Sequence, residues 1–235
     1  MNHNFVKVAS AIPNVKVGNC KHNTSHIINL IEQAEKKAVE IVCFPELCIT
    51  AYTCQDLFES TLLLDEVIKS ITYITEATRR MDIISILGAP IRIDNFLANC
   101  AVVVQRGKII GVVPKTYLPN YKEFYEKRWF ASSDEIQSGV INLCGQTVPA
   151  GRNLLFKTEN SIFGIEICED MWAPIPRSSN LALAGADIIF NLSADNECVG
   201  KYDYVKSLAV GQSARTISGY VFTSCGWGES TQDVV

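Results

Sequence analysis

Residues 162–172 have the sequence IFGIEICEDMW, an apolar run with the length and composition of a buried strand that ends abruptly in a cysteine and two acidic residues. Two other short apolar runs end in a similar way, since residues 41–46 are IVCFPE and residues 109–115 are IIGVVPK. In α/β sheets, ligands lie beyond the carboxyl ends of the strands, where side chains from several strands converge. The three runs therefore predict a sheet whose strand ends bring a glutamate, a lysine and a cysteine together.

Between and after these runs, short apolar segments alternate with stretches of helical periodicity. Strands are predicted at residues 5–12, 41–44, 83–89, 98–105, 108–113, 154–157, 162–168, 187–192 and 220–225, and helices at residues 24–39, 61–80, 180–184 and 204–217. Asn23 or Thr24 is the expected N-cap of the first helix, and Arg106-Gly107 fits a tight hairpin turn. Helical connections favour parallel pairing and hairpins favour antiparallel pairing, so the pattern predicts an α/β fold with a mixed sheet.

The composition excludes several classes of protein. The chain has 235 residues, of which 48% are hydrophobic and 20% charged, and this excludes intrinsic disorder. Lysine and arginine (21) against aspartate and glutamate (25) give a net charge of −4 without a basic block, so no nucleic-acid partner is expected. The best apolar run, residues 83–91, is half of the ~18 residues that a membrane span needs, and no membrane association is expected.

The cysteines and the N-terminus predict a cytoplasmic protein. The chain contains nine cysteines, an odd number, and no C-x-x-C pair. Its first ten residues, MNHNFVKVAS, lack the basic region and apolar stretch of a secretory signal. These features indicate reduced and mostly buried thiols.

The three histidines, His3, His22 and His26, all lie within the first 26 residues. A nucleophile further along the chain has no histidine near it in sequence, so a carboxylate or a lysine is the expected base. Cys20 forms a C-x-H-x-x-x-H run with His22 and His26, but no fourth ligand accompanies it. We interpret this run as the solvated start of a helix and expect no metal site.

Glu46, Lys115 and Cys168 together form a set of groups suited to acyl transfer. Taken singly, each has a more ordinary interpretation: a loop carboxylate, a surface lysine and a buried thiol. Their joint position at strand ends favours an active site in which Glu46 takes the thiol proton of Cys168. The Lys115 ammonium and the backbone N–H that follows the nucleophile would then stabilise the oxyanion of a tetrahedral intermediate.

The longest irregular stretch, residues 116–153, is rich in aromatic side chains interleaved with charged ones. Loops of this length are usually functional or mobile. This stretch and Trp172 either form the wall of a pocket or pack as a lid with a charged rim, and we favour the pocket wall.

Three strings in the sequence, VCFPELCITAY (42–52), VVPKTYLPNYKEFYEKRWF (112–130) and GIEICEDMW (164–172), resemble the signature blocks of the nitrilase, or carbon–nitrogen hydrolase, superfamily. The resemblance covers essentially the whole chain and implies a single domain over residues 1–235, with an α-β-β-α sandwich and mixed β-sheets. It also implies four catalytic roles. The general base would be Glu46, the oxyanion stabiliser Lys115, the nucleophile Cys168 and the second carboxylate, which orients the lysine, Glu123.

A finer resemblance is to the glutaminase domain of glutamine-dependent NAD synthetases, carried by Tyr52 and by the strings CEDMWAPIP (168–176) and NLSADNECVGK (191–201). It implies hydrolysis of the side-chain amide of glutamine, or of a related small amide. The substrate-binding residues that we assign are Tyr52, Tyr121, Glu169, Trp172, Asp195 and Lys201. Asp195 departs from the pattern, because these relatives often have serine there, so its charge would either repel the substrate's α-carboxylate or favour its α-ammonium.

Such synthetases also carry an ATP-dependent module with a glycine-rich phosphate loop, and neither an S-G-G-x-D-S string nor G-x-x-x-x-G-K-[ST] occurs here. The chain is therefore either the N-terminal domain of a longer enzyme, truncated at its C-terminus, or a stand-alone hydrolase of the amidase, carbamoylase or nitrilase type. In the first case the synthetase module is a partner in cis. ATP and Mg would serve only that module, and the amidase half would need no cofactor.

Two further expectations concern assembly and class. We expect the protein to form a homo-oligomer. A non-catalytic binding module or a thiol-redox module is the alternative from a different class, because nine cysteines offer other thiol chemistry.

Overall fold

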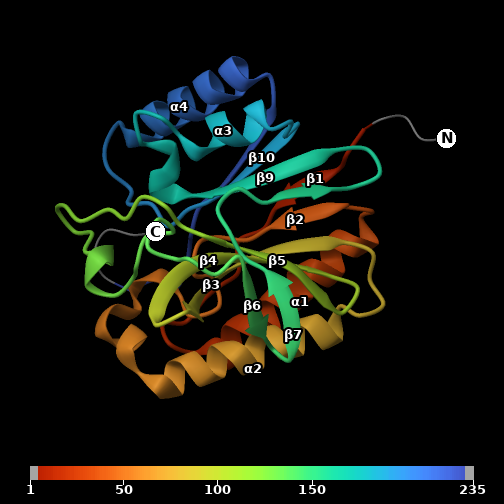
Figure 1. The fold of residues 1–235 in the computed structure, drawn as a ribbon, viewed down its shortest axis with the longest axis vertical. Helices are drawn as coiled ribbons and strands as arrows, with labels where there is room; N and C mark the ends of the chain where they lie inside the picture. The colour runs from red at the N-terminus through yellow and green to blue at the C-terminus, as the bar shows by residue number, and fades with distance from the viewer. Residues whose placement is uncertain (1–4, 231–235) are drawn as a thin grey trace.

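The computed structural model describes residues 5–230, in which two β-sheets are stacked face to face and helices cover the outer faces (Figure 1). The first sheet has the order β1-β2-β3-β4-β5, with bounds β1 Val8–Ser10, β2 Ile41–Cys43, β3 Ile84–Ile93, β4 Phe96–Gln105 and β5 Lys108–Pro114. The second has the order β11-β10-β9-β8, with bounds β8 Leu155–Lys157, β9 Ile162–Ile167, β10 Ile188–Leu192 and β11 Gly219–Thr223. A separate hairpin consists of β6 Val140–Leu143 and β7 Gln146–Pro149.

The helices connect the parallel strands. The α-helices are α1 Cys20–Lys36, α2 Thr61–Ala77, α3 Arg177–Leu183 and α4 Lys201–Thr216, and the short 3-10 helices are η1 Tyr52–Glu59, η2 Glu126–Arg128 and η3 Cys168–Met171. Strands β1, β2 and β3 pair in parallel through the crossovers α1 and α2, and β9, β10 and β11 pair in parallel through α3 and α4. The hairpin-connected strands β3–β4, β4–β5 and β8–β9 are antiparallel. Both sheets are therefore mixed.

Apolar side chains fill the space between the two sheets. The buried residues of this layer are Ile41, Cys43, Ile84, Ile86, Ala101, Val103 and Val113 from the first sheet and Phe156, Phe163, Ile165, Ile167, Phe190 and Leu192 from the second. Because a sheet covered on both faces needs apolar residues on both sides of each strand, these strands have nearly continuous apolar sequences instead of alternating ones.

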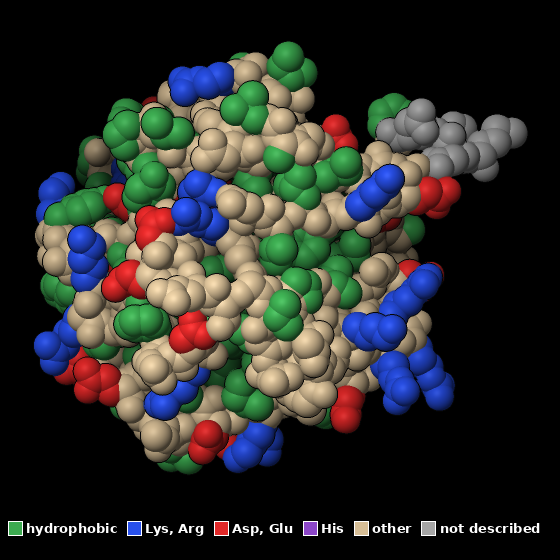
Figure 2. Space-filling view, viewed as in Figure 1, with side chains coloured by type: hydrophobic (Ala, Val, Ile, Leu, Met, Phe, Trp, Pro, Cys, Tyr) green, Lys and Arg blue, Asp and Glu red, His purple; other side chains and the backbone are tan. Residues whose placement is uncertain are grey.

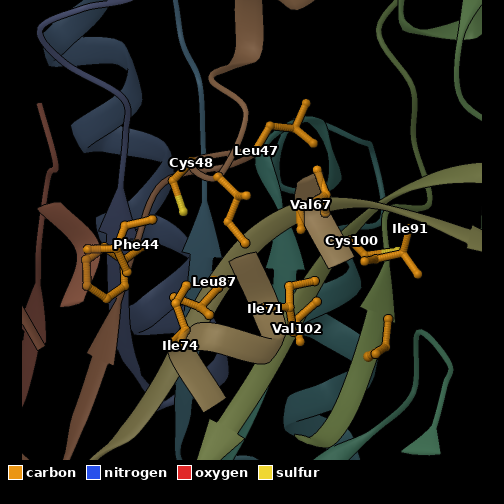
Figure 3. Close-up of a cluster of buried hydrophobic side chains, with 14 of the residues drawn as sticks. Phe44, Leu47, Cys48, Val67, Ile71, Ile74, Leu87, Ile91, Cys100 and Val102 are labelled. Carbon is orange, nitrogen blue, oxygen red and sulfur yellow. The ribbon is translucent and has the colours of Figure 1, made fainter. Parts of the chain in front are cut away.

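Helices α1 and α2 cover the outer face of the first sheet. Val67, Ile71 and Ile74 recur along one side of α2 at helical spacing and are fully buried. Figure 3 shows these side chains in one buried cluster that also contains Leu87 of β3 and Val102 of β4. On the opposite side of the molecule, α3 and α4 cover the second sheet (Figure 1). The predicted α-β-β-α sandwich is confirmed.

Two predictions about local structure were wrong. Helix α1 begins at Cys20, not after residue 23, and its N-cap is Asn19, whose side chain accepts a hydrogen bond from the backbone N–H of His22. Asn23 lies inside the helix, where its side-chain amide donates to the backbone carbonyls of Lys16 and Ile49. The stretch 116–153 is also less irregular than predicted, because it contains η2 and the β6–β7 hairpin.

Within residues 5–230, no helix combines the length and the apolar character that crossing a membrane requires. The face shown in Figure 2 carries lysine, arginine, aspartate and glutamate side chains distributed among apolar ones.

Candidate active site

The ends of three strands bring Glu46, Lys115 and Cys168 together. Glu46 lies in the turn after β2, Lys115 follows β5 directly, and Cys168 opens η3 directly after β9. The Nζ of Lys115 lies 2.6 Å from Oε1 of Glu46, and neither side chain is exposed to solvent. Both charged groups act electrostatically on the Cys168 thiol. The structure thus brings together the three side chains that the sequence placed at strand ends.

The Glu46 carboxylate is held at both of its oxygens. Oε1 accepts hydrogen bonds from the Lys115 ammonium and from the Asn99 side-chain amide, each at 2.6 Å, and Oε2 accepts one from the backbone N–H of Ala194 at 2.9 Å. Burial raises the pKa of Glu46 to about 7, although the Lys115 ammonium opposes this rise and the nearby Glu126 carboxylate adds to it. A carboxylate with this pKa can both take and return a proton near neutral pH.

The turn that carries Glu46 depends on a glycine in the neighbouring strand. A Cβ atom at Gly88 of β3 would overlap the backbone of Pro45 and Leu47. Ile49 closes the turn against the same strand, because its N–H donates to the carbonyl of Gly88 at 3.2 Å. Only glycine therefore allows the turn to pack this closely against β3, and this packing positions Glu46.

The second carboxylate on Lys115 is Glu126, and the prediction of Glu123 was wrong. Lys115 Nζ lies 2.6 Å from Oε1 of Glu126, which is buried in η2. Glu123 instead accepts a hydrogen bond from the side-chain amide of Asn196 on the wall of the cavity described below. Burial alone would lower the pKa of Lys115, but the carboxylates of Glu126 and Glu46 outweigh it and hold that pKa well above its ordinary value.

Cys168 has a strained backbone and faces a cavity. Its φ of 43° lies in the left-handed region, which side chains other than glycine rarely adopt. A cavity of about 370 Å³ opens beside it. Burial, together with the Glu46 carboxylate, raises the pKa of the thiol well above its ordinary value, and the Lys115 ammonium opposes this rise. At rest the sulfur therefore keeps its proton, beside a carboxylate able to take it.

Asp170 is a residue of the site that the sequence reasoning missed. Its Oδ1 accepts hydrogen bonds from the backbone N–H groups of Thr116 (3.1 Å) and Tyr117 (2.8 Å), and its Oδ2 accepts one from Ile167 (3.0 Å). The carboxylate thereby ties the segment after Lys115 to the residue before Cys168. Burial raises the pKa of Asp170 to about 7 against these hydrogen bonds. The sequence feature that could have identified Asp170 is an acidic residue in the turn that follows a predicted strand.

The predicted substrate-binding residues divide into two groups. Tyr121, Glu169, Trp172, Asp195 and Lys201 all line the cavity beside Cys168. The Tyr121 hydroxyl donates to the Glu169 carboxylate, with distances of 3.0 and 3.2 Å to its two oxygens. Tyr52 does not belong to this group.

Tyr52 is buried at the start of η1, and its hydroxyl donates to Oε1 of Glu126 at 2.8 Å. Tyr52 therefore holds the carboxylate that pairs with Lys115. The structure does not place Tyr52 on the cavity wall where a substrate contact was predicted.

Lys201 neutralises the unusual aspartate of the cavity. Its ammonium forms an ion pair with Asp195, donates to the side-chain carbonyl of Asn196, and lies 5.3 Å from the centre of the Trp172 ring. Asp195 therefore does not present an isolated negative charge to a ligand. The wall combines two lysines, Lys122 and Lys201, with carboxylates and aromatic rings, which suits a small zwitterion.

Among residues 5–230, no cluster of three or more histidine, cysteine, aspartate or glutamate side chains is placed to hold a metal ion. The rings of His22 and His26 lie 4.3 Å apart on α1, and His22 Nε2 lies 3.2 Å from the carbonyl oxygen of Asn14. His3 lies outside the described residues.

The sequence matches the family model described as "Carbon-nitrogen hydrolase" over residues 7–226. It is 35% identical over 233 residues to the glutamine-dependent NAD(+) synthetase of Mycobacterium leprae, and the alignment covers 98% of this chain and 34% of that protein. The corresponding enzyme of Aquifex aeolicus is 30% identical over 83% of this chain and 31% of its own length. The chain thus spans about a third of the length of these curated relatives.

Solved structures of related proteins also resemble this chain in fold. A glutamine-dependent NAD(+) synthetase from Cytophaga hutchinsonii superposes with a TM-score of 0.84 at 30% identity, covering 94% of this chain and 36% of that one. An amidase of the nitrilase superfamily from Nesterenkonia has a TM-score of 0.79 at 12% identity, covering 97% of this chain and 79% of that one. The second likeness concerns the fold alone.

Proposed function

This chain belongs to the carbon–nitrogen hydrolase family, and from that premise we propose that it hydrolyses the side-chain amide of glutamine through a thioester on Cys168. We further propose that the ammonia serves glutamine-dependent NAD synthesis by an ATP-dependent module outside residues 1–235. The observation that carries the proposal is the buried ion-pair network of Glu46, Lys115 and Glu126 beside a thiol that faces a cavity. The relatives that match nearly the whole chain supply the substrate and the partner module.

In the first half-reaction, Glu46 takes the thiol proton while the sulfur of Cys168 attacks the carboxamide carbon. Lys115 and the backbone N–H of Glu169 stabilise the oxyanion. That N–H lies in the first turn of η3, where helix geometry leaves backbone donors unused by the helix itself. As the carbon–nitrogen bond breaks, Glu46 passes its proton to the leaving nitrogen, so that ammonia departs.

In the second half-reaction, Glu46 takes a proton from water, and the resulting hydroxide attacks the thioester carbon. The carbon–sulfur bond breaks, Glu46 returns a proton to the sulfur, and glutamate leaves. The groups of the protein suffice for both steps. We therefore propose that the hydrolysis needs no cofactor, and that ATP and Mg serve only the synthetase module.

The cavity wall supports an amino acid as substrate. Lys201 and Lys122 are the cations of this wall suited to the α-carboxylate, while Glu169 and Glu123 supply carboxylates on the same wall for the α-ammonium. A simple aliphatic amide or a nitrile has neither an α-carboxylate nor an α-ammonium and does not need these charged side chains. We therefore place glutamine ahead of the stand-alone amidase, carbamoylase and nitrilase alternatives.

Ammonia release distinguishes these alternatives directly. We expect kcat/KM for glutamine to exceed that for asparagine, acetamide, propionamide, a carbamoyl amino acid and an aliphatic nitrile by at least about tenfold, because only glutamine satisfies both charges of the wall at the right length. Preference for an uncharged amide would favour the stand-alone hydrolase.

A thiol-reactive amide mimic tests the remaining alternative. Stoichiometric labelling of Cys168 that is lost in Glu46→Gln supports the enzyme. Labelling spread over several cysteines, with no turnover of any amide, would favour a binding or thiol-redox module.

The pKa of Glu46 predicts a specific pH dependence. The carboxylate must be ionised to act as base, so kcat/KM should rise with pH through an apparent pKa of about 7. The pKa values of Cys168 and Lys115 are raised well above their ordinary values, so the rate should stay level on the alkaline side through pH 9. Initial rates from pH 5 to 9.5 measure this profile, and a rising limb centred below pH 5.5 would contradict the assignment.

Asp170 provides the control for this profile, because its pKa is also raised to about 7. Within residues 5–230 its carboxylate accepts hydrogen bonds from backbone N–H groups, so Asp170→Asn should lower the rate while leaving the limb near pH 7 in place.

The cellular setting and the assembly are further proposals. All nine cysteines are free thiols, which suits the cytoplasm. Helices α3 and α4, which cover the second sheet, expose the apolar side chains of Leu183, Tyr202 and Val210, and this supports a homo-oligomer.

A further inference from the structure

The carboxylate of Glu229 caps a helix that lies far from it in the sequence. Its Oε1 accepts a hydrogen bond from the backbone N–H of Tyr52 at 2.8 Å. Its Oε2 accepts from the backbone N–H of Thr53 at 3.0 Å and from the hydroxyl of Thr53 at 2.7 Å. These N–H groups open η1, and the first N–H groups of a helix have no acceptor within it. Glu229 therefore supplies what η1 lacks at its start.

The start of η1 needs this support. Its N-cap, Ala51, has a φ of 71° in the left-handed region, and its side chain has no oxygen with which to cap the helix. A residue held in such a conformation persists only when the surrounding structure fixes it. The two charge-assisted backbone contacts from Glu229 are at the adjoining residues 52 and 53.

Tyr52 connects this cap to the catalytic cluster. Its hydroxyl donates to Oε1 of Glu126, the same oxygen that accepts the Lys115 ammonium at 2.6 Å. Oε2 of Glu126 is buried without a hydrogen-bond partner among the described residues. The orientation of this carboxylate thus depends on the contacts that converge on one oxygen, of which Tyr52 provides one.

The segment that carries Glu229 is itself fixed by backbone contacts. The N–H of Val15 donates to the carbonyl of Trp227 at 3.2 Å, and the N–H of Ser230 donates to the hydroxyl of Thr53 at 2.9 Å. Gly228 has a φ of 103°, and a Cβ atom there would overlap the backbone of Val15. The position of Glu229 is therefore determined by the fold around it.

We propose that Glu229 is a positioning residue for amide hydrolysis: through Tyr52 it fixes the orientation of Glu126 and hence of Lys115 at the oxyanion site. The turnover readout of this inference rests on the proposed function. Its second readout, alkylation of the Cys168 thiol, depends only on the surroundings of the sulfur. Glu229 does not line the cavity beside Cys168, so it acts on the reaction only through other side chains.

A double-mutant cycle tests the proposal. The rate of alkylation of Cys168 by iodoacetamide, read by mass spectrometry on the Cys168 peptide, reports the environment of the sulfur whatever the natural substrate is. Glu229→Ala and Tyr52→Phe should each lower this rate by about tenfold, because sub-ångström displacement of a charged partner is costly at a reacting atom. The double variant should be no more than about twofold slower than either single variant, since both act through one contact.

Asp94 is the matched control. Its carboxylate accepts hydrogen bonds from the backbone N–H groups of Gln137 and Ser138 and from the Ser138 hydroxyl. These are the same kinds of donor that Glu229 has, but Asp94 has no contact with Tyr52 or Glu126 in the described residues. Asp94→Ala should leave the alkylation rate within twofold of the parent.

The outcomes separate this proposal from the proposed function. With glutamine, Glu229→Ala should lower kcat by about tenfold and leave KM within twofold, because Glu229 touches no substrate. Multiplicative effects of Glu229→Ala and Tyr52→Phe on alkylation, or an Asp94→Ala effect of equal size, would overturn the positioning role even if glutamine is hydrolysed. If glutamine is not hydrolysed, a non-additive alkylation cycle still supports it. Glu229→Gln, which keeps one acceptor oxygen, replaces the alanine variant should that one fail to fold.

Discussion

Replacing Cys168 with alanine should abolish amide hydrolysis and leave the fold intact. The sulfur is the atom that forms the thioester, and no water-based route through Glu46 and Lys115 replaces a covalent nucleophile at comparable rate. Residual kcat should be below about 1% of the parent. The side chain forms part of a cavity wall, so its truncation leaves little new empty volume in the core. Thermal unfolding and steady-state ammonia release measure the two effects.

Cys198 offers a matched control for this variant, because its thiol lies on the wall of the same cavity and is exposed. Cys198→Ala should retain most of the activity. Turnover above about 1% in Cys168→Ala, or a loss in Cys198→Ala as large as that in Cys168→Ala, would assign the nucleophile to another residue.

Replacing Lys115 with methionine should lower kcat by at least ~10² and also destabilise the fold. Methionine has a similar length but no charge, so the oxyanion loses a donor, and loss of one such donor typically costs ~10²–10³ in rate. The substitution also leaves Glu46 and Glu126 facing each other in a buried site. Removing one partner of a buried ion pair costs about 3–5 kcal/mol. Urea unfolding and kcat are the measurements.

A second substitution separates the two effects of Lys115→Met. Adding Glu126→Gln removes one of the unpaired carboxylates, so the double variant should recover much of the lost stability without recovering turnover. A rate loss of less than tenfold in Lys115→Met would remove this lysine from the oxyanion site. An unchanged urea midpoint would show that the two carboxylates do not depend on it.

Much of the active site could be predicted because strand ends are visible in the sequence. A short apolar run is easily recognised, and the residue that follows it lies at the edge of the sheet. Glu46, Lys115 and Cys168 could therefore be placed together although they are distant in sequence. The three signature strings then predicted the family, which the match over residues 7–226 confirms.

The second carboxylate could not be placed by the same reasoning. Glu123 and Glu126 lie in one segment without regular periodicity, so spacing alone does not say which side chain points inward. The N–H of Glu126 donates to the carbonyl of Pro119, and this turn directs Glu126 to Lys115 and leaves Glu123 on the cavity wall. Such a turn is set by tertiary packing.

The contacts of Glu229 and Asp170 illustrate the same limit. The two residues that Glu229 caps are 176 and 177 positions away in the chain, and no local pattern marks a carboxylate as the cap of a remote helix. Asp170 bonds to N–H groups both beside it and more than fifty residues away. These partners are determined only once the two sheets have stacked.

One lysine between two glutamates has a consequence for the end of the catalytic cycle. With both carboxylates ionised, the three side chains carry one excess negative charge in a place without solvent. An amide is uncharged at its reacting carbon when it enters, whereas the acid that hydrolysis leaves there is an anion. While the oxyanion exists, Glu46 holds the transferred proton and the cluster is neutral. Once Glu46 has returned that proton, the cluster is negative again and repels the product carboxylate, which favours its departure and opposes the reverse reaction.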